Sequence, residues 1–380
     1  MAALSGGHLA VDFASGAVPA LLPFLAVKFD LSYTATAGIM LAATMSSSLV
    51  QPAFGLLSDR RGAMWLLPAG VLLAACGIGL AGIAQSYALV LASVFVGGVG
   101  IAAYHPEGAK FAAYASGRRR ASGMSLFNVG GNAGYALGPI VITPVVLWLG
   151  LSGAFLAALP ALAIGVALVL VLPYLRSIQP DGHARSAAGR DRPRAMALLI
   201  GVIVMRSTTW FGLITFVPLW MVSLGHSEAE GNRLLSLMLV AGVAGALAVG
   251  PVADRVGLRR TLLATTVVLP PLVLVFVYVG GVAGAVALML VGACVVGTFG
   301  VVMVLSQLYL PQHMALASGL NVGLAVGLGG VAAVALGSVA DAVDLETALT
   351  LCAVTPVVAA ALCLLLPAPQ GRLAGVPARA

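Results

Sequence analysis

Charged residues are almost absent from the long apolar stretches of this 380-residue chain. Aspartate, glutamate, lysine and arginine make up 8% of the residues, and hydrophobic residues make up 61%. Three formally charged side chains lie well inside the apolar stretches: Asp12, Glu107 and Arg206. A charge in the bilayer centre costs about 3 kcal/mol on the mildest scale, so such residues usually face an interior cavity and mark a substrate or proton path. The sequence therefore predicts a chain that crosses a membrane many times, with these three residues as functional candidates.

Composition excludes several classes of protein. Soluble chains carry about a quarter of their residues as charged side chains, whereas this chain has a mean hydropathy of +1.09. It contains no G-x-x-x-x-G-K-[ST] string, G-x-S-x-G elbow or H-E-x-x-H helix, motifs that mark nucleotide-driven machines and hydrolases. We therefore expect no enzyme, no cofactor and no ATP-driven pump, and transport that uses an existing gradient.

The cysteines and the first apolar run carry no special signal. Four cysteines lie in apolar runs without a CxxC pair or metal-ligand spacing: Cys76, Cys294, Cys352 and Cys363. They read as small buried hydrophobes, so we expect neither a disulfide nor a metal site. The run 4–27 is long enough to span a bilayer and carries Asp12, unlike a cleaved signal peptide.

Twelve stretches have the roughly 20 mostly apolar residues that a spanning helix needs. They lie near 4–27, 34–57, 64–84, 87–111, 121–148, 152–175, 196–223, 232–253, 260–282, 284–309, 316–340 and 347–367. The expected fold class is an all-α membrane protein, with twelve transmembrane helices in two pseudo-symmetric six-helix bundles. The one long polar stretch reads as a flexible linker. The expected divisions are an N-terminal bundle (1–175), a cytoplasmic linker (176–194), a C-terminal bundle (195–370) and a cytoplasmic tail (371–380).

Basic residues gather on one side of the predicted spans. Sixteen of the 19 lysines and arginines follow even-numbered spans or lie at the C-terminus: Arg60, Arg61, Lys110, Arg118, Arg119, Arg120, Arg176, Arg185, Arg190, Arg192, Arg194, Arg255, Arg259, Arg260, Arg372 and Arg379. Only Lys28 and Arg233 fall on the other side. The positive-inside rule then places both termini in the cytoplasm of a multi-pass protein of the cytoplasmic (inner) membrane. This asymmetry explains the net charge of +7 by contact with the lipid bilayer, without nucleic acid.

The two halves carry the same loop string. G-x-x-x-D-R-x-G follows the second span at Gly55, Asp59, Arg60 and Gly62, and it follows the eighth span at Gly250, Asp254, Arg255 and Gly257. Every matching position is displaced by 195 residues. This duplicated string resembles the loop signature of the major facilitator superfamily, and the resemblance covers essentially the whole chain. It implies substrate sites near the bilayer midplane, between the two halves.

The resemblance also implies a gate. The first glycine of each copy would allow close helix approach, and the last would allow a tight turn. The aspartate would dock at a helix N-terminus in the other half and latch the cytoplasmic side; the alternative is a solvated turn carboxylate. The family's further basic residue is present in the second copy as Arg259 and Arg260 but is replaced by Ala63 and Met64 in the first. The first latch is therefore expected to be weaker.

The fifth span contains Gly134-x-x-x-Gly138-Pro139. This string looks like the antiporter motif of drug:proton exchangers, and it implies export. The closing glycine pair is missing, since Ile142 and Thr143 follow. Small residues at this spacing also serve ordinary helix packing, which remains the alternative.

Several local strings together resemble the fosmidomycin-resistance branch of the superfamily. They are His8-Leu-Ala-Val-Asp12, Ser47-Ser48-Leu-Val-Gln51-Pro52, Tyr104-His105-Pro106-Glu107 and Gly130-Gly131-Asn132. The branch is associated with export of a phosphonate antibiotic, so the resemblance implies proton-coupled efflux.

The first and fourth spans carry titratable groups at similar depth. His8 lies one turn before Asp12, and His105 and Glu107 lie near the end of the fourth span. We expect these four side chains to meet in one cluster that carries protons, since imidazole titrates near neutral pH. Pro106 should loosen the fourth helix and provide a bending point. The alternatives are an interfacial His8 and a structural hydrogen-bond network.

Substrate contacts are expected from polar residues near the midplane. Arg206 lies about eleven residues into the seventh span, one turn before Trp210. It could balance a carboxylate, bind an anionic substrate with its guanidinium fork, or pair structurally with carbonyls. Further candidates for the lining of the site are Tyr104, Asn128, Asn132 and Gln307.

The sequence thus predicts a secondary transporter that works as a monomer by rocker-switch alternating access. Its expected activity is proton-driven export of a small-molecule substrate, a drug or an organic anion. One alternative is a proton symporter that imports an organic anion or another metabolite. A third hypothesis, a membrane sensor or scaffold, is disfavoured by the short loops and the absence of a signalling domain.

Overall fold

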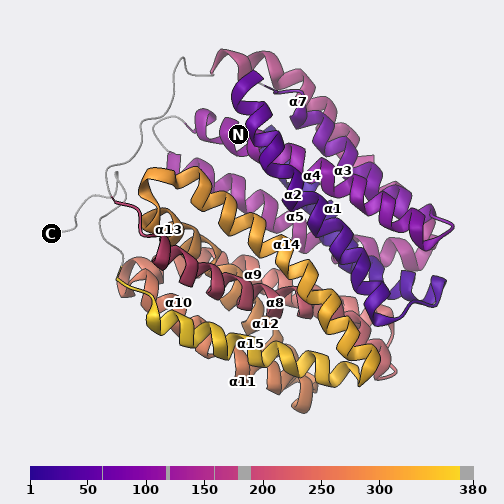
Figure 1. Cartoon of the computed structure of the whole chain (residues 1–380). Coiled ribbons are helices and arrows are strands. Elements are labelled where there is room, and N and C mark those ends of the chain that lie inside the picture. Colours follow the sequence, from indigo (N-terminus) through magenta and orange to yellow (C-terminus); the bar gives the residue numbers. More distant parts are fainter. Residues whose placement is uncertain (62, 117–119, 158, 179–189, 369–380) are drawn as a thin grey trace.

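The computed structural model describes residues 1–61, 63–116, 120–157, 159–178 and 190–368, and within these ranges every regular element is a helix. Twelve of the described helical segments are long and apolar enough to cross a membrane, which confirms the number and approximate positions of the predicted spans. Such segments satisfy their backbone hydrogen bonds internally, as lipid requires. Figure 1 shows two groups of helices side by side, α1–α7 in indigo to magenta and α8–α15 in rose to yellow.

The N-terminal half consists of six spans. Their helices are α1 (Ala2–Phe29), α2 (Tyr33–Arg61), α3 (Leu66–Ile83), α4 (Tyr87–Ala115), α5 (Arg120–Leu149), η2 (Leu151–Gly153), α6 (Ala154–Ala157) and α7 (Leu159–Ser177). Most are single helices that correspond to one predicted span each. The sixth span begins irregularly, because Gly150 turns the chain with a φ of 71° before η2.

The C-terminal half has more interruptions. Its elements are α8 (Pro193–Ser223), α9 (Glu228–Val256), α10 (Leu258–Val267), α11 (Leu269–Leu274), η3 (Val275–Val279), α12 (Gly281–Gly297), α13 (Phe299–Tyr309), η4 (Pro311–His313), α14 (Met314–Ala342) and α15 (Leu345–Leu365). Pro270 and Pro271, which lack the N–H that an α-helix interior needs, mark the break between α10 and α11. Gly280 and Gly281 adopt positive φ and separate the ninth span from the tenth.

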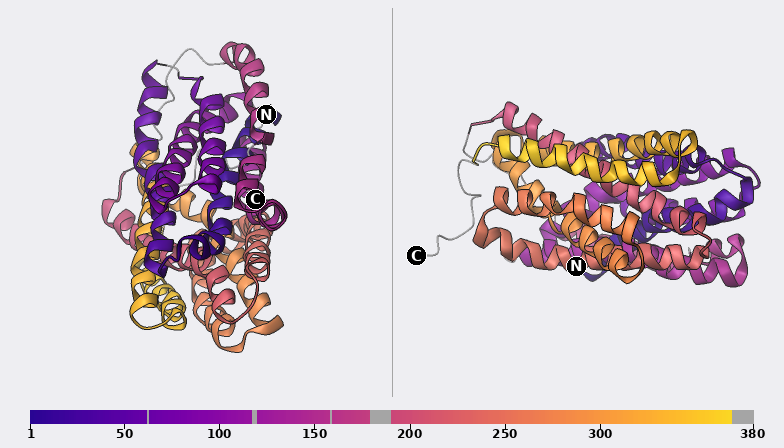
Figure 2. Two further views of the ribbon diagram at one scale, coloured as in Figure 1. Left: turned by 90° about the vertical axis from the view of Figure 1, so that its right-hand side faces the viewer. Right: turned by 90° about the horizontal axis from the view of Figure 1, so that it is seen from below.

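The two ends of the helix bundle differ in their loops. We call the end where α7 stops at Ser177 and α8 begins at Pro193 the linker end, and the opposite end, where α1 stops at Phe29 and α9 begins at Glu228, the distal end. Most of the predicted linker and the whole predicted tail lie outside the described residues, so the domain division stays a prediction. The two further views in Figure 2 show the long helices running along the same general direction between these ends.

The halves meet chiefly through α2 with α14 and through α5 with α9. At the distal end, the backbone amides of Tyr33 and Thr34 donate to the Asp341 carboxylate at 2.8 and 2.9 Å. In the same region the Asn232 side-chain amide donates to the Ala20 carbonyl at 2.9 Å. These hydrogen bonds join the two halves at this end of the bundle.

The contact between α2 and α14 loosens toward the linker end. A Cβ added at Gly337 would clash with backbone atoms of α2, and one added at Gly330 would clash with a side chain of α2. At Gly327 it would come no closer than 3.4 Å to α2, and at Gly323 no atom lies within 4 Å. Since Gly323 precedes Gly330 by seven residues, the two lie on nearly the same helical face. The contact between α2 and α14 is therefore close at the distal end and looser toward the linker end.

Candidate functional site

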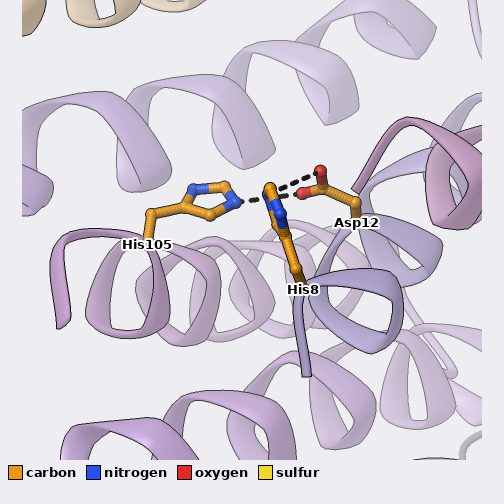
Figure 3. Close-up of side chains that lie close together, drawn as sticks. All are labelled: His8, Asp12 and His105. Carbon is orange, nitrogen blue, oxygen red and sulfur yellow. Dashed lines mark hydrogen bonds and ion pairs between the residues drawn. The ribbon is translucent and has the colours of Figure 1, made fainter. Parts of the chain in front are cut away.

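Three titratable side chains from α1 and α4 meet inside the N-terminal half. His8 and Asp12 lie one turn apart on α1, with 3.3 Å between His8 Nε2 and Asp12 Oδ2. From α4, His105 Nε2 lies 3.1 Å from Asp12 Oδ1. Figure 3 shows both imidazole rings directed at the one carboxylate. The Asp12 carboxylate is thus held between two histidines, as the sequence predicted for these three residues.

The surroundings of His8 fix its ring. Its Nδ1 lies 2.8 Å from the Phe127 carbonyl oxygen of α5, and the ring stacks on the Phe127 side chain with 4.1 Å between centroids. Behind the site, a Cβ on Gly131 would clash with Asp12 Oδ2 and His8 Nε2. Only glycine at this position lets α5 approach the cluster so closely. The side chains of His8, Asp12 and His105 are 11%, 19% and 24% exposed, so the site is confined but reachable.

Glu107 does not join this cluster, and the expected group of four is corrected to three. Its carboxylate is fully buried and lies 2.9 Å from Lys110 Nζ. The Ser58 hydroxyl of α2 donates to the same carboxylate oxygen. Residues 105 and 107 are about 200° apart around a helix, so only one of them can face α1. Sequence reasoning missed the Glu107–Lys110 pair, although its i,i+3 spacing on a helix signals such a contact.

Arg206 is satisfied within the C-terminal half. Its guanidinium donates to the hydroxyls of Thr266 and Thr298 and, at 3.1 Å, to the Cys294 carbonyl. Cys294 lies in the last turn of α12 and Thr298 lies at the break between α12 and α13, where helical carbonyls can lose their regular partners. These contacts favour the structural alternative over an anchor for substrate. Neither Asp12 nor Glu107 is among the hydrogen-bond or ion-pair partners that Arg206 has in the described residues.

The other candidates for the lining of the site differ in accessibility. Tyr104 is fully buried, and its hydroxyl donates to the Leu4 carbonyl, so it tethers α4 to α1. Trp210 is partly buried against the hydrophobic core. On α5, Asn128 is exposed and Asn132 is half-buried; Gln307 on α13 is half-buried too. Their roles in substrate binding stay predictions.

The glycines of the fifth span pack α5 against α1. A Cβ at Gly134 would clash with the Leu9 carbonyl, and one at Gly138 would clash with the backbone at Gly16. In this structure the two glycines therefore lie in the contact between α5 and α1, as the packing alternative requires. Pro106 lies within α4, which continues as a helix to Ala115.

The structure describes the second copy of the loop signature and part of the first. In the second copy, Asp254 and Arg255 are exposed at the end of α9. No atom lies within 4 Å of a Cβ added at Gly250. Gly257 ends the helix and turns the chain with a φ of 103°. In the first copy, a Cβ at Gly55 would lie 3.9 Å from Pro106. The side chains of Asp59 and Arg60 and the whole of Gly62 lie outside the described parts of the structure. The latch therefore stays a prediction.

Twelve membrane-length helices in the described residues, with a titratable cluster inside the first six, are the architecture of a multi-pass membrane transporter. A sequence model of the Major Facilitator Superfamily matches residues 4–334. The chain belongs to this superfamily, whose members are transporters and not enzymes, and the predicted family is confirmed.

Two relatives match nearly the whole chain. An uncharacterised transporter of the superfamily from Bacillus subtilis (strain 168), YfnC, is 30% identical over 96% of this chain and 91% of its own length. The Fosmidomycin resistance protein of Escherichia coli (strain K12) is 28% identical over 94% of this chain and 90% of its own.

Solved structures show the same fold. One is a bacterial homologue of the human lysosomal transporter Spinster, in an inward-facing and unoccupied conformation. It has a TM-score of 0.75 at 14% identity, and the match covers 96% of this chain and 95% of the homologue's chain. FucP in the outward conformation has a TM-score of 0.67 at 19% identity. The match covers 96% of this chain and 98% of the FucP chain.

Proposed function

We propose that this transporter is a proton-coupled antiporter that exports a small drug or organic anion of the fosmidomycin class by rocker-switch alternating access. The linker end would face the cytoplasm of the inner membrane, as the distribution of basic residues indicates. The interface that is closed at the distal end would then correspond to an inward-open state. The similarity to a fosmidomycin resistance protein supports this class of substrate.

The observation that carries the proposal is the cluster of His8, Asp12 and His105. Two imidazoles, the side-chain type whose ordinary pKa lies nearest neutral pH, flank one carboxylate at 3.1 and 3.3 Å. Each proton changes the charge of this confined site by one unit. The affinity of the site for a charged ligand changes with it, which is the coupling that antiport requires.

The test uses inside-out vesicles whose lumen is acidified by respiration and monitored with a pH-sensitive dye. Fosmidomycin and a panel of organic anions are added from outside. For the wild-type protein, we expect substrate entry to release luminal protons and collapse the pH gradient.

Asp12→Asn should abolish this collapse but retain substrate exchange between equal pH values, because the amide keeps the shape of the side chain without its charge. Asp30→Asn is the matched control: Asp30 is exposed at the distal end of the same helix, with a φ of 49° that asparagine tolerates. Uphill transport by Asp12→Asn at the wild-type rate would refute the role of the cluster. A gradient that collapses only when substrate is preloaded in the lumen would instead indicate symport.

A further inference from the structure

The cluster of His8, Asp12 and His105 also has the donor set of a metal site. One ligand atom from each of His8, Asp12 and His105 lies within 4.8 Å of the other two. Zinc binds imidazole nitrogen and carboxylate oxygen at about 2.0–2.2 Å, so its ligand atoms lie about 3.3–3.5 Å apart in a tetrahedron. The separations of 3.3 Å between His8 Nε2 and Asp12 Oδ2 and of 3.1 Å between His105 Nε2 and Asp12 Oδ1 are close to this value.

The hydrogen bond of His8 fixes which ring nitrogen faces Asp12. The Phe127 carbonyl oxygen only accepts, so His8 Nδ1 must carry the proton in their 2.8 Å bond. In the neutral ring, Nε2 then presents a lone pair to the Asp12 carboxylate at 3.3 Å. Two electron-rich atoms are stable at this distance only if a proton or a metal ion lies between them. A histidine that donates its other N–H to a backbone carbonyl is also the usual second-shell arrangement of metal-bound imidazole.

The identity of the three donors selects the type of ion. Two imidazoles and one carboxylate suit Zn²⁺, Co²⁺, Ni²⁺ or Cu²⁺, whereas Mg²⁺ and Ca²⁺ prefer oxygen ligands alone. Three protein ligands leave one tetrahedral position for water or another ligand. The partial exposure of Asp12 and His105 leaves that side of the site accessible.

We propose that His8 Nε2, His105 Nε2 and the Asp12 carboxylate bind a divalent first-row transition cation of the Zn²⁺ class, with a fourth position open to water or to an oxygen of an anionic ligand. A dication with one carboxylate keeps a net positive charge, so the occupied site would attract an anion. Cysteine spacing in the sequence gives no sign of this site, because its ligands come from α1 and α4, and Asp12 and His105 are 93 residues apart. The proposal does not depend on proton coupling or on the direction of transport.

The test is a titration of the full chain, purified in detergent without a histidine tag, with Co²⁺ as a spectroscopic substitute for Zn²⁺. We expect visible absorption bands of a low-symmetry Co²⁺ site that saturate at one equivalent and disappear when Zn²⁺ is added. His105→Ala and Asp12→Asn should each weaken binding at least about tenfold, because even loss of an outer-shell contact costs about 10–100-fold.

His226→Ala is the matched control, since His226 is half-exposed and contacts Glu230 at 3.7 Å, outside the cluster. It should bind like the wild type. Size-exclusion chromatography and circular dichroism show whether each variant is folded. If one of the two ligand variants does not fold, the other still tests the proposal. Absence of one-equivalent binding, or binding that neither ligand variant weakens, would overturn the proposal. Because the readout is equilibrium binding, either result leaves the vesicle test of proton exchange unaffected.

Discussion

At the scale of single residues, two carboxylates buried in the same half have different partners. Asp12 lies between two histidines and is partly accessible, whereas Glu107 is fully buried beside Lys110 and Ser58. A partly accessible carboxylate can exchange protons and ligands. A buried one paired with a permanent cation serves to join helices, here α4 to α2.

Glu107→Gln should therefore act on stability first. It leaves the largely buried Lys110 ammonium without its counter-charge, and breaking such a pair costs about 3 kcal/mol. We expect a lower midpoint of thermal unfolding in detergent. The double variant Glu107→Gln/Lys110→Met should recover much of this loss, because neither charge remains. Strictly additive losses would show that the pair does not interact.

Gly131→Ala should impair transport more than folding. The new methyl group would overlap Asp12 Oδ2 and His8 Nε2, so both side chains must move. We expect at least about a tenfold loss of substrate-induced proton release, since displacement of reacting groups by about 1 Å can cost a hundredfold. Gly6→Ala is the control, because no atom lies within 4 Å of a Cβ there. Equal activity of both variants would contradict the tight contact between α5 and the cluster.

At the scale of helices, the N-terminus of α2 is capped from the other half of the molecule. Ser32 accepts the Ala35 amide within its own half, and Asp341 accepts the Tyr33 and Thr34 amides from across the interface. An acidic residue near the end of α14 is unfavourable for that helix's own dipole but favourable at the start of α2. Its position is thus explained by the distal contact between the halves.

Asp341→Asn should loosen this contact. Loss of a charge at a helix N-terminus costs about 1 kcal/mol at an exposed position, or about a fivefold change in the equilibrium. We would label Asp30→Cys and Val343→Cys, both exposed at the distal end, with spin labels in a chain lacking its native cysteines. Asp341→Asn should increase the population with long distances between the labels. An unchanged distance distribution would show that Asp341 does not hold the halves together at the distal end.

At the scale of the whole molecule, the start of the C-terminal half is anchored at the linker end. Asp191 accepts a hydrogen bond from the Gln312 backbone N–H at 2.9 Å and contacts the His313 ring. The Arg192 backbone N–H donates to the Tyr309 carbonyl at 2.7 Å. Partial desolvation opposes ionisation of Asp191, but the Gln312 amide and the His313 ring outweigh it and lower the pKa of its carboxyl group. The segment before α8 is thereby tied to the connection between α13 and α14.

This anchor should resist mild acid. Because the pKa of Asp191 is lower in the folded chain, its stabilising contribution is full above the ordinary Asp pKa of about 3.9 and is lost as the pH falls through the lowered value. A spin label at Arg190→Cys should therefore keep its mobility from pH 7 to 5 and become more mobile only below about pH 4. Asp191→Asn should increase that mobility already at pH 7. A label at Val343→Cys reports on general unfolding, and loosening at pH 6 would contradict the assignment.

Much of the helical architecture follows from the sequence alone. Twelve charge-poor stretches become helices because lipid offers no hydrogen bonds to the backbone, and the described structure confirms them. The contact between His8 and Asp12 is equally local, because an i,i+4 spacing brings side chains together on any helix. The pairing of Glu107 with Lys110 is local as well and could have been predicted.

Only the tertiary structure decided which polar groups meet across helices. Helical periodicity shows that His105 and Glu107 face different directions, but the packing of α4 against both α1 and α2 determines which of them reaches Asp12. Likewise, the hydropathy pattern placed Arg206 in a span but did not show the break between α12 and α13 that accepts its hydrogen bonds. Contacts within one helix depend on sequence spacing, whereas contacts between helices depend on how each helix is rotated, and packing of the whole bundle sets that rotation.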